Sequence, residues 1–255
     1  MINNDFFLTP QWEVNFREKI SCGFTLPITG NLSHTRDSIL SGFSTYQNRV
    51  NLLKKLDLTT YSYFSPLQIH TDIIIEVNQS NKNNGFYDKS NANEGDGCIT
   101  KDQGILLVTT WADCVPVIFY EFNKNIIASV HSGWKSTYKQ IVNKTVDKII
   151  EMGGSLDSLL VAIGPAIKNC CYEVGSEFLS YFKGYDECFI YKEEKLFFDP
   201  SLAVYKQLID IGVKKENIDL SNLCTKCFDK PNFFSFRKDP VNFEGQGAFI
   251  ALKRI

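Results

Sequence analysis

Four short apolar runs lie close together in the middle of the chain, and they limit the fold more than any other feature. They cover residues 104–109, 115–120, 126–130 and 159–164. Short apolar runs bounded by turn residues are typical of buried strands. Between the last two runs, residues 135–152 place their apolar side chains on one stripe, which predicts a helix. Strands and a helix in this order predict the α/β (α+β) class.

The remainder of the chain adds weaker signals that fit the same architecture. Residues 78–97 are polar and rich in asparagine, which predicts a long exposed loop. We also expect a strand and turn at 1–20, a helix within 36–58, a strand at 73–77, a helix at 201–211, and strands at 233–237 and 247–253. No repeat or compositional boundary divides the sequence. We therefore predict one domain over residues 1–255, with a mixed β-sheet flanked by helices.

Charge and hydropathy argue against two classes of partner. Lysine and arginine number 27 against 29 acidic residues, so the net charge is −2. This balance excludes a protein that binds nucleic acid through bulk positive charge. No apolar run reaches the roughly 18 residues that span a membrane, and the first residues lack the pattern of a secretory signal. We expect a cytoplasmic protein without nucleic-acid or membrane partners, and the sequence indicates no oligomeric state.

The chain contains eight cysteines, most of which we interpret as buried thiols. A cytoplasmic chain of 255 residues can build its core without disulfides. Cys224 and Cys227 form a CxxC pair, but neither a second CxxC nor a histidine pair lies near it in the sequence. This pair and the adjacent Cys170 and Cys171 are therefore weak indications of a metal or redox site.

Three residues at strand ends suggest a metal site. His70 precedes the strand at 73–77, Cys114 lies in a turn between two strands, and His131 follows a strand. Their separations are too wide for a zinc finger, but they suit a site assembled from several strand ends. Two imidazoles and one thiolate leave a fourth position open, as in catalytic zinc sites. The alternative is a buried thiol beside two hydrogen-bonded structural histidines.

A series of motifs identifies a family resemblance that extends over most of the chain. The motifs are GFTLPITGNLSHTRDS at 23–38, NR at 48–49, QIH at 68–70, GDGCIT at 95–100, TTWADCVPV at 109–117, SVHSGWKST at 129–137, AIGPAIKNCCYEVG at 162–175, CTKC at 224–227 and FFSFRKD at 233–239. Through them the chain resembles the YfiH-like family. This family is also called the multicopper polyphenol oxidase or laccase-domain family, and more recently purine nucleoside phosphorylase.

The resemblance implies a set of site residues. It assigns zinc, with copper as the alternative metal, to His70, Cys114 and His131. It also implies that Arg49 holds phosphate, a role that suits the planar guanidinium. We place Asn31 and Ser33 beside that phosphate, where the backbone N–H groups of residues 30–33 can contact the anion.

Near the C-terminus the chain departs from the family pattern. The family often has RRDG and TGR where this chain has RKDP at 237–240 and EGQ at 244–246. A further departure is GPAI at 164–167, where the family often has GPCI. The C-terminal departures put a role for a second arginine in doubt.

The resemblance also implies an activity on purine nucleosides. It predicts phosphorolysis of adenosine, inosine, guanosine or methylthioadenosine, and hydrolytic deamination of adenosine. Zinc deaminases carry an HxE glutamate that moves protons, whereas this chain has His131-Ser132-Gly133. Asp96, Asp113 and Glu173 are the acid/base candidates, because they lie in or beside the motifs.

Three alternative functions remain. A multicopper laccase needs many more histidines than the three in this chain, but a single copper ion at the same site is possible. Cys114 is a possible nucleophile of a cysteine hydrolase, with His131 as its base. The third alternative is a non-enzymatic editing or binding factor for cell-wall metabolism.

Overall fold

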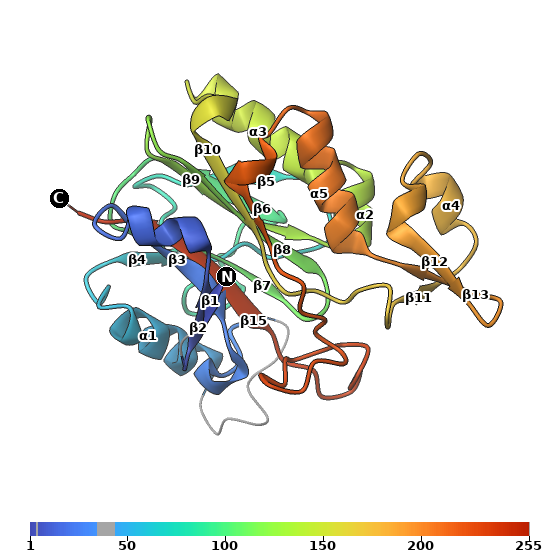
Figure 1. Cartoon of the computed structure of the whole chain (residues 1–255). Helices are drawn as coiled ribbons and strands as arrows, with labels where there is room; N and C mark the ends of the chain where they lie inside the picture. Colours follow the sequence, from blue (N-terminus) through green and yellow to red (C-terminus); the bar gives the residue numbers. More distant parts are fainter. Residues whose placement is uncertain (4, 35–43, 255) are drawn as a thin grey trace.

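The computed structural model describes residues 1–3, 5–34 and 44–254. Two six-stranded sheets form its centre (Figure 1). In spatial order, the first sheet contains β1 (Ile2–Asn3), β2 (Phe7–Thr9), β3 (Ile20–Thr25), β15 (Gln246–Leu252), β7 (Ile105–Trp111) and β4 (Ser62–Phe64). The second contains β14 (Ile218–Leu220), β10 (Leu159–Ile163), β8 (Val115–Glu121), β9 (Ile126–Ser132), β6 (Gly97–Thr100) and β5 (Ile74–Glu76). Both sheets are antiparallel inside and have parallel strands at an edge.

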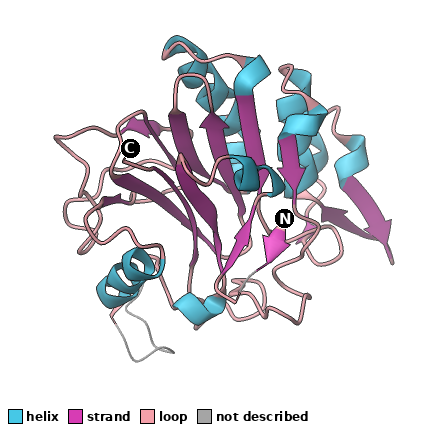
Figure 2. Ribbon diagram, turned by 60° about the vertical axis from the view of Figure 1, so that its left-hand side comes forward, coloured by secondary structure: helices cyan, strands magenta, loops and turns pink. Residues whose placement is uncertain are grey.

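The two sheets pack face to face. Phe24 and Ile250 of the first sheet share one apolar core with Ile118 and Ala162 of the second. A polar contact crosses the same interface, where the Ser129 hydroxyl donates to the Ala248 carbonyl at 3.1 Å. Figure 2 shows the strands gathered at the centre of the molecule. The turn between β7 and β8 is one place where the chain passes from the first sheet to the second. This turn therefore lies where the ends of both sheets meet.

Helices cover the outer faces of the two sheets. α3 (Ile141–Glu151) and α5 (Pro200–Asp210) pack on the second sheet, and α1 (Thr45–Lys55) packs on the first. Strands such as β8 and β9 are buried on both faces, which explains why they read as continuous apolar runs.

A smaller unit lies beside this sandwich. It contains β11 (Glu173–Val174), β13 (Lys195–Phe198), β12 (Phe189–Lys192) and α4 (Phe178–Tyr181). Short 3-10 helices occur at Gln11–Asn15, Pro27–Thr29, Leu156–Ser158, Asp186–Cys188 and Lys215–Asn217. An aromatic cluster that includes Phe178, Phe182 and Phe198 holds the small unit together.

The α/β class with mixed sheets is confirmed, and the strands divide between two large sheets. The predicted helix at 135–152 consists of two helices, α2 (Trp134–Tyr138) and α3. They are separated because Gln140 adopts a left-handed conformation with φ of 59°, which interrupts the helical path. The predicted strand at 233–237 is wrong, since this segment forms turns and loops. Part of the helix predicted within 36–58 lies outside the described residues, and α1 forms the rest.

The described residues contain no helix that is both long enough and apolar enough to cross a membrane.

Candidate metal centre

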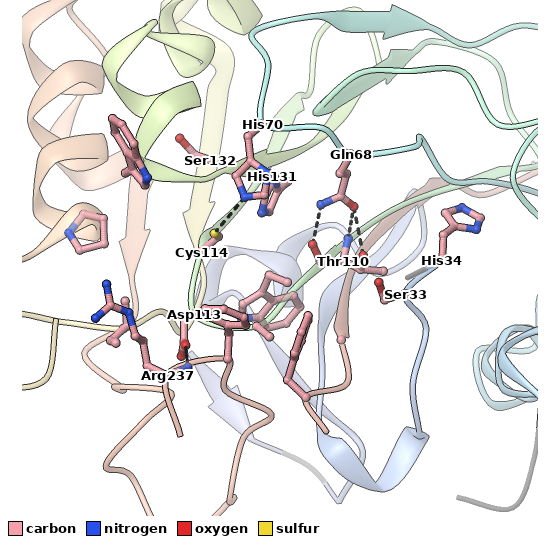
Figure 3. A pocket seen from close by; sticks show the side chains of 18 of the residues that line it. Ser33, His34, Gln68, His70, Thr110, Asp113, Cys114, His131, Ser132 and Arg237 are labelled. Atoms are coloured by element: carbon pink, nitrogen blue, oxygen red, sulfur yellow. Dashed lines mark hydrogen bonds between the residues drawn. The ribbon is translucent and has the colours of Figure 1, made fainter. Parts of the chain in front are cut away.

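The structure brings His70, Cys114 and His131 together. The potential ligand atoms of the three side chains all lie within 4.8 Å of one another. His70 Nε2 is 3.9 Å from Cys114 Sγ, and the two imidazole rings meet edge to face with centroids 5.0 Å apart. The side chains come from the loop before β5, the turn between β7 and β8, and the end of β9 (Figure 3).

Asp96 holds both histidines in position from the residue just before β6. One of its carboxylate oxygens contacts His131 Nδ1 at 2.8 Å and accepts the backbone N–H of His70 at 3.1 Å. The other accepts the backbone N–H and the hydroxyl of Thr71. Because Nδ1–H of His131 donates to this carboxylate, Nε2 of His131 is available as a metal ligand. Such an outer carboxylate orients a ligating histidine and raises its basicity.

The backbone around the three side chains is constrained. His70 and Asp113 have positive φ values of 59° and 83°, a left-handed region that is uncommon for non-glycine residues. A Cβ atom on Gly133 would lie 2.6 Å from the His70 ring and 3.3 Å from Cys114 Sγ. Gly133 therefore allows the start of α2 to approach the cluster closely.

The three side chains and Asp96 strongly perturb one another's protonation. Burial disfavours the thiolate of Cys114, but charge on His131 and hydrogen bonds from both histidines lower the Cys114 pKa to about 6. Burial also disfavours the charged form of His131, yet the Cys114 thiolate and Asp96 raise its pKa. Burial opposes ionisation of Asp96 as well, and its bonds to His131 and Thr71 lower its pKa. The cluster thus favours a thiolate, which is the form that binds metals.

The cluster forms part of the wall of a pocket with a volume of about 400 Å³. This volume lies in the range of small-molecule sites. Aromatic side chains make up much of the remaining wall: Trp111, Trp134, Tyr172, Phe236 and Phe243. Arg237 adds a positive charge, and its guanidinium lies 5.0 Å from the centroid of the Tyr172 ring.

Asp113 connects three loops around this pocket. One carboxylate oxygen accepts the Thr225 hydroxyl at 2.6 Å, and the other accepts the backbone N–H of Arg237 at 2.7 Å. The Asp113 carbonyl also accepts the backbone N–H of Ile167. Asp113 is therefore placed to position Arg237. Glu173, the third acid/base candidate, lies on the exposed strand β11 beside Lys195, outside the residues that line the pocket.

The predicted phosphate residues occupy different positions. Ser33 lines the pocket, whereas Asn31 is buried beside it and accepts the backbone N–H groups of Ser33 and Gly245. Arg49 is 1% exposed, and its guanidinium donates to the carbonyls of Leu32, Gly85 and Phe86. It also contacts Nδ1 of His34, which lines the pocket, and lies 5.8 Å from the centroid of the Tyr63 ring. Direct phosphate binding by Arg49 therefore stays a prediction.

Sequence reasoning missed several residues of this site. Gln68 anchors the His70 loop to β7, since its side-chain amide bonds both the N–H and the carbonyl of Thr110 (Figure 3). Arg237 and Tyr172 were not assigned to the pocket, although both lie within motifs. Their place in the pocket depends on contacts between segments that are distant in the sequence. Membership of a motif is therefore the one sequence signal that could have found them.

Comparisons with known proteins agree with the site and the fold. A model of the family described as multi-copper polyphenol oxidoreductase laccase matches residues 34–253. A purine nucleoside phosphorylase of Clostridium acetobutylicum is 38% identical over 190 residues, which cover 73% of this chain and 75% of the relative. An adenosine deaminase from an unknown prokaryotic organism is 28% identical over 201 residues, 76% of each chain. The crystal structure of hypothetical protein YfiH from Bacillus licheniformis superposes with a TM-score of 0.84 at 27% identity, covering 95% of this chain and 94% of that one.

This chain belongs to the multi-copper polyphenol oxidoreductase laccase family. The resemblance predicted from the motifs is thereby confirmed, as is the prediction that the protein is an enzyme.

The low pKa of Cys114 predicts unusual reactivity in protein stripped of metal with a chelator. At pH 7 a thiol with a pKa near 6 is ~90% thiolate, against ~3% for an ordinary cysteine. Alkylation of Cys114 by iodoacetamide, located by peptide mass spectrometry, should therefore slow only as the pH falls through about 6. Added zinc should protect Cys114. Reaction that follows an ordinary thiol pKa, with no zinc protection, would contradict this account of the cluster.

Proposed function

We propose that this protein is a zinc-dependent purine nucleoside phosphorylase that also deaminates adenosine. The observation that carries the proposal is the His70–Cys114–His131 group in the wall of an aromatic pocket that also contains Arg237. Relatives named purine nucleoside phosphorylase and adenosine deaminase support it. The proposed substrates are adenosine, inosine, guanosine or methylthioadenosine, together with phosphate. We further propose that the enzyme acts on these small molecules in the cytoplasm and needs no nucleic-acid or membrane partner.

The donor set fits a zinc ion. Two ligand atoms of one tetrahedral zinc lie ~3.5 Å apart, close to the 3.9 Å between His70 Nε2 and Cys114 Sγ. His70, Cys114 and His131 would hold the ion and leave a fourth position toward the pocket. When bound there, zinc supplies Lewis-acid chemistry, polarising an oxygen of water or phosphate. Copper also binds nitrogen and sulfur ligands well, so metal analysis of the purified protein decides between the two.

We assign recognition of phosphate to Arg237. Its planar guanidinium can donate two parallel hydrogen bonds to one anion, and Asp113 fixes its backbone. In phosphorolysis a phosphate oxygen forms a bond to C1′ of the ribose. The bond from C1′ to the purine nitrogen breaks, and the purine leaves after gaining a proton. Holding phosphate and nucleoside together in the pocket makes this step effectively unimolecular.

We assign binding of the purine to the aromatic wall. Rings such as Trp111, Phe236 and Phe243 offer flat apolar surfaces against which a base can stack. In deamination, water adds at C6 of adenine and ammonia leaves, giving inosine. Both oxygens of Asp96 and of Asp113 already accept hydrogen bonds. We therefore assign these carboxylates positioning roles.

Arg49 acts indirectly in this proposal. It ties the backbone of Leu32 and the ring of His34 to the segment at residues 85–86. It thereby fixes Ser33, which faces the pocket between them. Phosphate would contact Ser33 and Arg237, while Arg49 maintains the shape of the wall.

The first test measures metal content and products. Purified protein should contain zinc, release adenine from adenosine only with phosphate, and form inosine without it. Cys114→Ala and His131→Ala should lose both products by at least ~100-fold, because each removes a ligand of the metal. Cys188→Ala is the matched control, since this buried thiol lies outside the cluster and should leave activity unchanged.

Other outcomes identify the alternative functions. Full activity of chelator-treated protein, abolished by alkylation of Cys114, would replace the zinc enzyme with a cysteine hydrolase. Bound copper with oxidation of phenols would indicate the oxidase alternative. If the wild-type protein forms no product at all, the non-enzymatic binding or editing factor is the alternative that remains.

Arg237 has its own prediction. Arg237→Gln should raise the KM for phosphate by ~10-fold or more, because a charge-assisted hydrogen bond contributes ~1.5–3 kcal/mol. Deamination of adenosine, which uses no phosphate, should change much less. Arg254→Gln is the control, since Arg254 lies against Tyr61 near the C-terminus, outside the residues that line the pocket. An unchanged KM for phosphate in Arg237→Gln would remove Arg237 from phosphate binding.

A further inference from the structure

A second group of potential metal ligands lies outside the pocket. The sulfur atoms of Cys170, Cys171, Cys224 and Cys227 all lie within 4.8 Å of one another. Cys170 Sγ and Cys227 Sγ are 3.6 Å apart. In the sequence the CTKC motif has no partner pair nearby, but the fold supplies one from a segment more than fifty residues earlier.

The sheet topology brings the two segments together. Cys170 and Cys171 follow β10, whereas Cys224 and Cys227 follow β14. These strands are parallel neighbours, so both segments leave the second sheet at the same end of the strands. Backbone hydrogen bonds continue the pairing beyond the strands, from the Ala166 N–H to the Leu223 carbonyl and from the Thr225 N–H to the Ala166 carbonyl.

The distances suit four thiolates around one ion. Sulfur atoms of a tetrahedral zinc site, with Zn–S bonds of ~2.3 Å, lie ~3.8 Å apart. A disulfide requires ~2.05 Å between sulfurs, and all four cysteines are free. An iron–sulfur cluster spreads its cysteines around several metal atoms, which requires wider spacing than this compact group provides.

The four cysteines differ in exposure. Cys224 is buried, with 5% exposed, Cys171 is partly buried, and Cys170 and Cys227 are exposed.

We propose that Cys170, Cys171, Cys224 and Cys227 form a second metal site, which binds a structural zinc ion. Four protein ligands complete a tetrahedron and leave no open position, which is typical of structural rather than catalytic zinc. An all-thiolate set excludes magnesium and calcium, which require oxygen ligands.

This site would stabilise the wall of the pocket. Tyr172 follows Cys171 directly and lies against the Arg237 guanidinium. Thr225 lies between two of the cysteines, and its hydroxyl donates to Asp113. An ion that joins the two segments therefore fixes the positions of both Tyr172 and Thr225.

The experiment counts metal ions and identifies their ligands without an activity assay. Protein produced with added zinc sulfate and freed of loosely bound metal should contain about two zinc ions per chain. Cys227→Ser, at an exposed position, should lose one ion and retain the other. His131→Ala should show the converse loss, and the matched control Cys188→Ala should retain both. Thermal unfolding of each variant confirms that it is folded.

Cobalt provides a second readout that also needs no activity assay. Apoprotein titrated with cobalt chloride should bind two ions, one of which shows the intense thiolate-to-cobalt absorption of a four-cysteine site. Cys227→Ser should reduce that band. A single ion per chain that is lost in His131→Ala and unaffected by Cys227→Ser would overturn the proposal. So would a denatured-state thiol titration that finds a disulfide between any two of the four cysteines. Neither outcome depends on the activity at the pocket.

Discussion

The site depends on one buried carboxylate. Asp96 bonds the imidazole of His131, the backbone N–H of His70 and both donors of Thr71. Asp96 thereby fixes His131, near the end of β9, and His70, the loop residue with a positive φ. A buried carboxylate is unfavourable unless hydrogen bonds satisfy it, so the loop and the histidine hold each other through Asp96. This arrangement orients the His131 imidazole and fixes the backbone of His70 beside Cys114.

The two-sheet architecture explains why the cluster and the pocket coincide. The turn between β7 and β8 crosses from one sheet to the other, and it carries both Cys114 and Asp113. Cys114 faces the histidines, while Asp113 holds the loops of Thr225 and Arg237. One short turn therefore joins the candidate metal centre to the charged and aromatic wall. The four cysteines lie on the two segments that carry Tyr172 and Thr225, which contact Arg237 and Asp113.

Sequence reasoning predicted local structure better than long-range pairing. The apolar runs located the central strands because strands buried on both faces contain few polar residues. Their division into two sheets depends on pairings between segments far apart in sequence, such as β15 with β7. The same limit applies to the site. The motifs identified His70, Cys114 and His131, whereas the place of Arg237 and the union of two cysteine pairs emerge only when distant loops meet.

The most direct test of the central claim compares zinc affinity in two aspartate variants by competition with a chromogenic chelator. Asp96→Asn keeps the size of the side chain but removes the charge that orients His131, so zinc affinity at the histidine–cysteine site should fall by ~10–100-fold. Asp72→Asn, a control at a more exposed carboxylate that pairs with Lys139 and Lys144, should bind zinc as the wild type does. Equal affinity in Asp96→Asn and wild type would contradict the account, because the histidines would then be positioned without the carboxylate.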